Sequence, residues 1–134
     1  MKVSAFKGIE DGTWAQGTAK YEKRGVAAFV PVWNEANCIQ CNQCAYVCPH
    51  ASIRPFVLND EEQKGASFAM LDVKAPAAMK GMKFRMQVDV LDCLGCGNCA
   101  DICPGFKGNK ALSMVPLEGQ LAEADNWNYC VANV

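Results

Sequence analysis

The chain has 134 residues and is 51% hydrophobic, which fits one folded domain and excludes a disordered chain. Its net charge of −1, without a basic stripe, argues against a nucleic-acid partner. The N-terminus lacks the apolar core of a secretion signal, and the longest apolar run, Val26–Trp33, is too short to span a bilayer, so we expect a soluble, cytoplasmic protein without a membrane partner.

The first half of the chain predicts an arm followed by a small α+β unit. We expect residues 1–29 to form an N-terminal arm that has too few apolar residues for a core of its own and wraps the central domain, residues 30–118. That domain begins with a strand at Val30–Trp33, followed by a cysteine-rich loop and a short helix near Gln43–Val47. The helix should end before Pro49, because proline disfavours the helical conformation in the residue before it. A second strand is predicted at Ile53–Leu58.

The second half repeats this order after a long insert, residues 59–83. The insert begins with Asn59–Gly65, which we interpret as a solvated loop, and its apolar remainder is expected to pack on the domain. In the next strand, Phe84–Leu91, polar and apolar side chains alternate, which predicts half burial. The predicted elements after it are a cysteine loop, a helix near Asn98–Ile102, a strand at Ala111–Val115, and a C-terminal tail, residues 119–134, which we expect to wrap the domain and to be cut from a longer chain.

One internal repeat dominates the sequence. Eight of the nine cysteines lie in two runs of the spacing C-x2-C-x2-C-x3-C-P: Cys38, Cys41, Cys44 and Cys48 before Pro49, and Cys93, Cys96, Cys99 and Cys103 before Pro104. A [4Fe–4S] cube has four iron corners, each of which takes one thiolate, and three cysteines at steps of three in a tight loop can reach three corners. The doubled run therefore predicts two [4Fe–4S] clusters that carry single electrons.

The fourth cysteine of each run should serve the other cluster, as is general for this spacing in proteins with two clusters. We therefore expect one cluster on Cys38, Cys41, Cys44 and Cys103, and a second on Cys93, Cys96, Cys99 and Cys48. Structural zinc uses two C-x2-C pairs per ion, and disulfides need an oxidising compartment, so both alternatives explain the repeat poorly. A three-iron cluster would need a cysteine missing from one triple, and none is missing.

The residues between and after the cysteines, and the ninth cysteine, allow further predictions. Gly95 and Gly97 should let the second loop turn tightly and bring N–H groups against sulfur, whereas the first loop has Gln40 and Asn42 at these places. His50 could tune a cluster, although an ordinary surface histidine is the simpler interpretation. Cys130, the ninth cysteine, is expected to pack as a small buried hydrophobe. No catalytic constellation is present.

Several segments together resemble one family. They are Gly17–Gly25 (GTAKYEKRG), Cys38–Ala51 (CIQCNQCAYVCPHA), Asp92–Cys99 (DCLGCGNC) and Val115–Glu118 (VPLE). The chain is similar over nearly its whole length to the two-cluster, ferredoxin-like domain of pyruvate:ferredoxin (flavodoxin) oxidoreductases. This resemblance implies the bacterial 2[4Fe–4S] ferredoxin-like fold with a pseudo-twofold internal repeat.

The resemblance also implies a role in electron relay. In that family, thiamine diphosphate, magnesium, coenzyme A and a third cluster serve the chemistry of pyruvate, and all of them bind outside this segment. The implied function is to pass electrons from that third cluster to ferredoxin or flavodoxin, without turnover of pyruvate by this piece alone. A free-standing diffusible ferredoxin is the alternative. Candidate basic docking residues for an acidic carrier are Lys20, Lys23, Arg24, Lys107 and Lys110.

Overall fold

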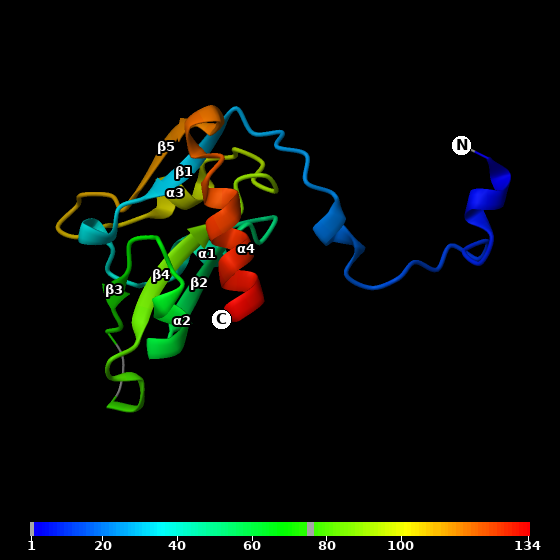
Figure 1. Cartoon of the computed structure of the whole chain (residues 1–134). Coiled ribbons are helices and arrows are strands. Elements are labelled where there is room, and N and C mark those ends of the chain that lie inside the picture. Colours follow the sequence, from blue (N-terminus) through cyan, green and yellow to red (C-terminus); the bar gives the residue numbers. More distant parts are fainter. Residues whose placement is uncertain (1, 75–76) are drawn as a thin grey trace.

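The strands pair across the two halves of the chain. The computed structural model describes residues 2–74 and 77–134. Its strands are β1 (Phe29–Trp33), β2 (Ile53–Leu58), β3 (Leu71–Asp72), β4 (Lys83–Val88) and β5 (Leu112–Pro116) (Figure 1). One antiparallel sheet joins β1 to β5, and the other has the order β2-β4-β3. The first strand of each half therefore pairs with the last strand of the other, so neither half has a sheet of its own.

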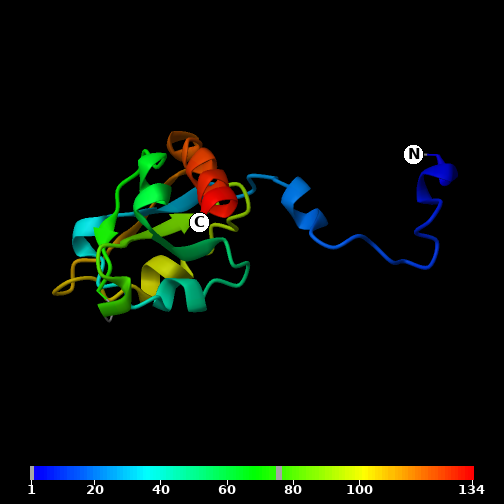
Figure 2. The same ribbon diagram turned by 60° about the horizontal axis from the view of Figure 1, so that its bottom comes forward.

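The helices lie on both sides of these sheets. They are α1 (Gln43–Tyr46), α2 (Asp60–Lys64), α3 (Asn98–Ile102) and α4 (Glu123–Asn133), and short 3₁₀ turns occur at Val3–Phe6, Thr18–Tyr21, Glu35–Asn37, Ala77–Met79 and Leu117–Gln120. Helices α1 and α3 lie side by side, whereas α4 packs on β4 from the opposite side (Figure 2). The predicted order of strand, cysteine loop, helix and strand is confirmed in both halves, and the fold class is α+β.

The hydrophobic core lies between the sheets and the helices α1 and α3. Its largest fully buried apolar side chains are Ile53, Leu58, Met86, Val30 and Val90. Complete burial of such a side chain contributes about 1.5–3 kcal/mol. The buried cysteines Cys44 and Cys99 belong to the same cluster of packed residues, so the core and the cysteine loops are continuous.

The prediction that the strand ending near Leu91 is half buried is wrong. Every residue from Phe84 to Val90 is buried. Two polar side chains of β4 face α4 rather than water: Arg85 donates to Glu123 Oε2 at 2.7 Å, and Gln87 donates to the same oxygen at 2.8 Å. Alternation in the sequence therefore marks two buried faces, one apolar and one with internally paired polar groups.

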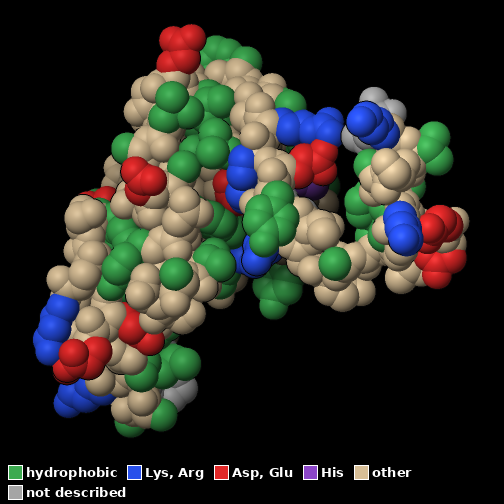
Figure 3. Space-filling view, turned by 45° about the vertical axis from the view of Figure 1, so that its right-hand side comes forward, with side chains coloured by type: hydrophobic (Ala, Val, Ile, Leu, Met, Phe, Trp, Pro, Cys, Tyr) green, Lys and Arg blue, Asp and Glu red, His purple; other side chains and the backbone are tan. Residues whose placement is uncertain are grey.

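Two further expectations need correction. The segment Asn59–Gly65 is not a loop but contains α2, because Asn59 caps its N-terminus and Glu62 completes a capping box. The N-terminal arm does not wrap the domain: from Lys2 to Glu22 it is almost entirely exposed and runs away from the body (Figures 1 and 3). The tail does pack, through the buried Trp127 and Cys130 of α4. No helix in the described residues is long and apolar enough to cross a membrane.

Candidate metal centres

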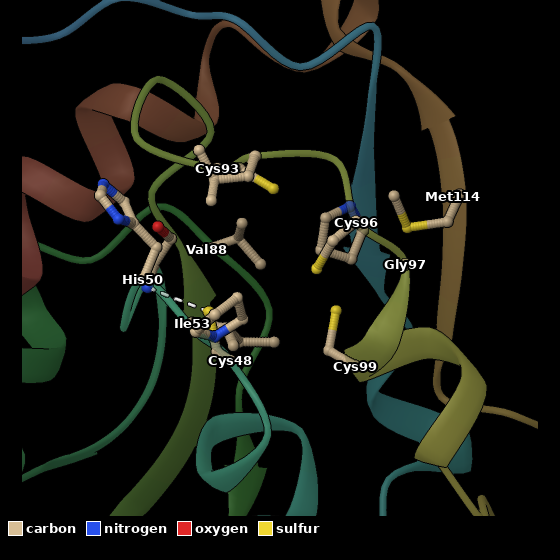
Figure 4. A pocket seen from close by; sticks show the side chains of 13 residues that line it. Cys48, His50, Ile53, Val88, Cys93, Cys96, Gly97, Cys99 and Met114 are labelled. Carbon is tan, nitrogen blue, oxygen red and sulfur yellow. Dashed lines mark hydrogen bonds between the residues drawn. The ribbon is translucent and has the colours of Figure 1, made fainter.

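Two pockets in the core are each lined by four cysteines. The first, here the Cys93 pocket, has four sulfur atoms around a common space (Figure 4): those of Cys48, Cys93, Cys96 and Cys99. The second, here the Cys38 pocket, is lined by Cys38, Cys41, Cys44 and Cys103. Each pocket thus combines three cysteines of one run with the fourth cysteine of the other, which is the grouping that crossed ligation requires.

The strand pairing explains this grouping. Ile53 of β2 pairs with Val88 of β4, so Cys48, just ahead of β2, lies near the loop that follows β4 and carries Cys93. In the same way Trp33, at the end of β1, pairs with Leu112 of β5. The loop after β1 carries Cys38, and the loop before β5 carries Cys103. The crossed sheets therefore bring the fourth cysteine of each run to the triple of the other run.

The spacing of the sulfur atoms bears on the kind of metal group. Among the described residues, no three Cys, His, Asp or Glu side chains converge closely enough to hold a single metal ion. Zinc would need such convergence, whereas a cube presents a different iron to each thiolate, so its ligands surround the group from several sides. All nine cysteines lie in the described residues and none forms a disulfide. Four cysteine side chains per pocket are the donor set that an iron–sulfur cube takes.

The backbone of both cysteine loops is left-handed at matching positions. Gly95 and Gly97 have φ of 68° and 81°, and Gln40 and Asn42 have φ of 62° and 60°. The expected tight turn of the second loop is confirmed, and the Gly95 N–H donates to Cys93 Sγ at 3.4 Å. The first loop adopts the same conformation with residues that are normally less tolerant of it.

Gln40 has a structural role that the sequence reasoning missed. Its side-chain amide donates to the carbonyl of Asp72 at 2.7 Å, and its oxygen accepts from the N–H of Lys74 at 2.8 Å. These two bonds join the first cysteine loop to the insert, next to β3. The signal in the sequence was a glutamine at a place where the second run has glycine.

Backbone N–H groups also face the fourth cysteine of each run. Ser52 donates to Cys48 Sγ at 3.3 Å, and Ala111 donates to Cys103 Sγ at 3.3 Å. Such bonds stabilise negative charge on sulfur, in a free thiolate as in one bound to iron. In each pocket the donor is the residue directly before the following strand, β2 or β5.

Burial alone would keep Cys44 and Cys99 protonated at neutral pH. It raises the pKa of Cys44 to about 12 and that of Cys99 to about 11, although a backbone N–H partly offsets the effect at both residues. Metal ligation needs thiolates, so filling the pockets must release protons. One cysteine of each pocket, Cys41 or Cys96, is exposed, so both pockets approach the surface.

One candidate docking residue is instead a structural tie. Lys23 donates to Asp92 Oδ2 at 2.6 Å and to the buried carboxylate of Asp89. Burial lowers the pKa of Lys23, but the hydrogen bonds to both carboxylates outweigh it, so the pKa lies above its ordinary value. Lys23 fastens the end of the arm to the segment that leads into the second cysteine run, and it is not available to a partner.

The structure also shows the surroundings of His50 and Cys130, whose roles the sequence left open. His50 is exposed and lies at the edge of the Cys93 pocket (Figure 4). Cys130 is completely buried, as predicted, and burial raises the pKa of its thiol to about 11. It lines neither cysteine pocket.

Comparison with known proteins gives a consistent result. A family model described as a 4Fe-4S dicluster domain matches residues 37–106, and one described only as a domain of unknown function matches residues 1–27. The chain is 52% identical to a pyruvate-flavodoxin oxidoreductase of Enterobacter agglomerans, over 98% of this chain and 11% of the relative. It is 49% identical to a pyruvate:ferredoxin oxidoreductase of Moorella thermoacetica, over 95% of this chain and 12% of the relative.

The fold and the two cysteine pockets define an iron–sulfur protein, and the chain belongs to the 4Fe-4S dicluster domain family. Within that family, it is homologous to the dicluster segment of pyruvate-flavodoxin and pyruvate:ferredoxin oxidoreductases. The chain spans about a tenth of the length of these relatives.

Proposed function

We propose that this domain transfers electrons through two [4Fe–4S] clusters held by crossed ligation. One cluster would be held by Cys38, Cys41, Cys44 and Cys103, and the other by Cys93, Cys96, Cys99 and Cys48. The observation that carries the proposal is the pair of four-cysteine pockets, each built from both runs. A bound [4Fe–4S] cluster supplies one-electron transfer, with a reduction potential that its surroundings set.

The chain's own residues set those surroundings. Apolar side chains, among them Ile53, Val88 and Met114, line the Cys93 pocket and exclude water from it. Burial of this kind disfavours the extra negative charge of a reduced state, whereas N–H groups such as that of Gly95 favour it. The balance between these two effects would fix the potential of each site.

We also propose that residues 30–118 form the two-cluster domain as two halves related by an approximate twofold axis, with an arm (residues 1–29) and a tail (residues 119–134). Three observations support the repeat: β1 pairs with β5, β2 pairs with β4, and α1 lies beside α3. The halves differ in the insert, residues 59–83, which is bonded to the first cysteine loop through Gln40.

The relatives' names suggest the position of the domain in a reaction. We propose that it relays electrons between the internal redox centre of a pyruvate:ferredoxin oxidoreductase and an external ferredoxin or flavodoxin. Thiamine diphosphate, coenzyme A and a third cluster would then bind in other domains of the parent enzyme. A free-standing ferredoxin is less well supported, because the similarity extends over 98% of the chain and so includes the arm and the tail.

Docking of the carrier would use charge near the Cys38 pocket. Lys107 follows Cys103 closely in the chain, and the backbone of Lys74 is bonded to Gln40 in the first cysteine loop. Both lysines are exposed. Weak redox encounters use small interfaces, below roughly 1,200 Å², in which a few charges can steer association.

The test mixes the reduced, reconstituted domain with oxidised ferredoxin or flavodoxin in a stopped-flow experiment. We expect rapid reduction of the carrier, a rate that falls with ionic strength, and no turnover of pyruvate by the domain alone. Replacing Lys74 and Lys107 by alanine should slow the reaction at low salt, whereas Lys2→Ala, on the remote arm, should not. A carrier that stays oxidised would refute the relay, and a rate indifferent to salt and to both lysines would refute only the docking surface.

A further inference from the structure

Two buried polar atoms stand out because they lack a partner. Among the described residues, the buried side-chain atoms without a hydrogen bond are Trp33 Nε1 and Asn42 Oδ1. Both side chains line the Cys38 pocket, and neither lines the Cys93 pocket. Buried polar groups in folded proteins are nearly always paired, so two exceptions in one pocket indicate that a hydrogen-bonding group occupies it.

The indole of Trp33 is held firmly in place. The residue is 8% exposed, ends β1 and packs edge-on against Phe84 with ring centroids 6.2 Å apart. The guanidinium of Arg85 lies over its ring, 5.1 Å from the centroid. An indole N–H can only donate, so the partner it lacks must be an acceptor.

The backbone of Asn42 is also held in place. Its backbone is left-handed, and its carbonyl accepts from Ala45 and Tyr46 at the start of α1. Asn42 is the N-cap residue of α1, but its side chain makes no capping hydrogen bond. The oxygen and nitrogen of a side-chain amide exchange places by a half-turn, after which the NH₂ group would occupy the buried position and donate. Glycine, which the second run has at this position as Gly97, would suit the backbone but could not donate.

We propose that Trp33 and Asn42 donate hydrogen bonds to the sulfur atoms of the cluster in the Cys38 pocket and raise its reduction potential above that of its neighbour. The proposal rests on the proposed function, since it presupposes a cluster in each pocket. Reduction adds one negative charge, and a hydrogen-bond donor stabilises the more negative state more strongly.

The charged side chains near the two pockets also favour a higher potential in the Cys38 pocket. Near the Cys38 pocket, two cations have one carboxylate partner each: Arg85 lies 2.7 Å from Glu123, and Lys110 lies 3.9 Å from Asp101. The segment leading into the Cys93 pocket instead carries the carboxylates of Asp89 and Asp92, which share the single cation Lys23. The first electron to enter the domain should therefore reside in the Cys38 pocket, and electrons should pass towards it from the Cys93 pocket.

The test compares two donor-removing variants with a matched control. Trp33→Phe keeps an aromatic ring between Phe84 and Arg85 but removes the N–H, and Asn42→Gly reproduces the residue of the second loop. Trp127→Phe is the control, because Trp127 is also a buried tryptophan but lines neither cysteine pocket. Reduction potentials are measured by redox titration monitored by electron spin resonance. Exchangeable protons coupled to the reduced cluster are detected by electron–nuclear double resonance in H₂O and D₂O.

Each donor variant should lower the potential of one cluster. We expect the ratio of reduced to oxidised cluster at a fixed potential to fall about tenfold, which for one electron corresponds to about 59 mV. One strongly coupled exchangeable proton should disappear in Trp33→Phe and persist in Trp127→Phe. Unchanged potentials and proton couplings in Trp33→Phe and Asn42→Gly would refute the inference and indicate that water satisfies these groups. Failure of the unmodified domain to bind iron would refute the proposed function instead, so the two failures are distinguishable.

Discussion

Replacing Gly95 by alanine should damage the Cys93 pocket much more than the same change at Gly97. Both glycines have positive φ, so either alanine would cost about 1–2 kcal/mol in backbone strain. A Cβ at Gly95 would also lie 3.0 Å from the carbonyl oxygen of Phe29 and 3.1 Å from Cβ of Ala27, whereas a Cβ at Gly97 would meet nothing within 4 Å. Overpacking of this kind costs about 1–3 kcal/mol.

The difference between the two variants is thus about 1–3 kcal/mol, or about five- to 150-fold in an equilibrium constant. The reconstituted domain is exposed to an iron chelator, and the loss of cluster absorbance is followed. If release proceeds through local opening of the loop, Gly95→Ala should release iron faster than Gly97→Ala by this factor, and only about half of its iron should be affected.

Gly97→Asn provides a matched control, because Asn42 occupies the corresponding place in the first run with φ of 60°. Asparagine tolerates this conformation better than other residues with a side chain, so the variant should release iron nearly as slowly as the unmodified domain. Equal rates for Gly95→Ala and Gly97→Ala would show that close packing of the second cysteine loop against Ala27 and Phe29 does not hold the pocket together.

Three further predictions follow from the ligands, the polar face of β4 and the arm. Cys48→Ala should remove the cluster of the Cys93 pocket, and Cys103→Ala that of the Cys38 pocket, as resolved by Mössbauer and spin-resonance spectra; damage confined to the cluster of the mutated run would contradict crossed ligation. Burial opposes ionisation of Glu123, but the hydrogen bond from Gln87 and the charge of Arg85 outweigh it and hold its pKa below the ordinary 4.5. The stability that ionised Glu123 contributes is therefore fully present above pH 4.5 and is lost as the pH falls through its lower pKa in the folded domain. Glu123→Gln should flatten the acid side of a plot of unfolding free energy against pH, and an unchanged slope would refute this. Lys23→Met should destabilise the domain by about 3 kcal/mol in urea unfolding, because it leaves the buried carboxylate of Asp89 without an opposite charge. Arg24→Met, at an exposed ion pair, should cost under about 1 kcal/mol.

Much of the fold could be predicted because the signals were local. The C-terminal ends of α1 and α3 were expected from the proline after each run, and the strands from short apolar segments. The left-handed turns at Gly95 and Gly97 follow from glycine in a short loop. The grouping of Cys48 with the second run and of Cys103 with the first agrees with the known behaviour of this spacing.

The wrong predictions have two causes: contacts between distant segments, and a local helix signal that was outweighed by charge. Arg85 and Gln87 are polar, so their strand looked half exposed; only the position of Glu123 on α4 shows that they are buried and paired. The capping box of α2 was visible in Asn59 and Glu62, but the high charge of the segment suggested a loop. The link from Gln40 to the insert and the unpaired atoms of Trp33 and Asn42 depend on the folded arrangement, which no periodic pattern encodes.

The most direct test of the central claim is the amount of iron and acid-labile sulfide in the domain after anaerobic reconstitution. Four thiolates per cube and eight ligand cysteines predict about eight irons and eight sulfides per chain. After reduction, the spin-resonance spectrum should show two magnetically coupled clusters, since the crossed loops hold the two pockets in one core. About four irons per chain, uncoupled signals, or zinc bound in stoichiometric amount would contradict a pair of [4Fe–4S] clusters held by these cysteines.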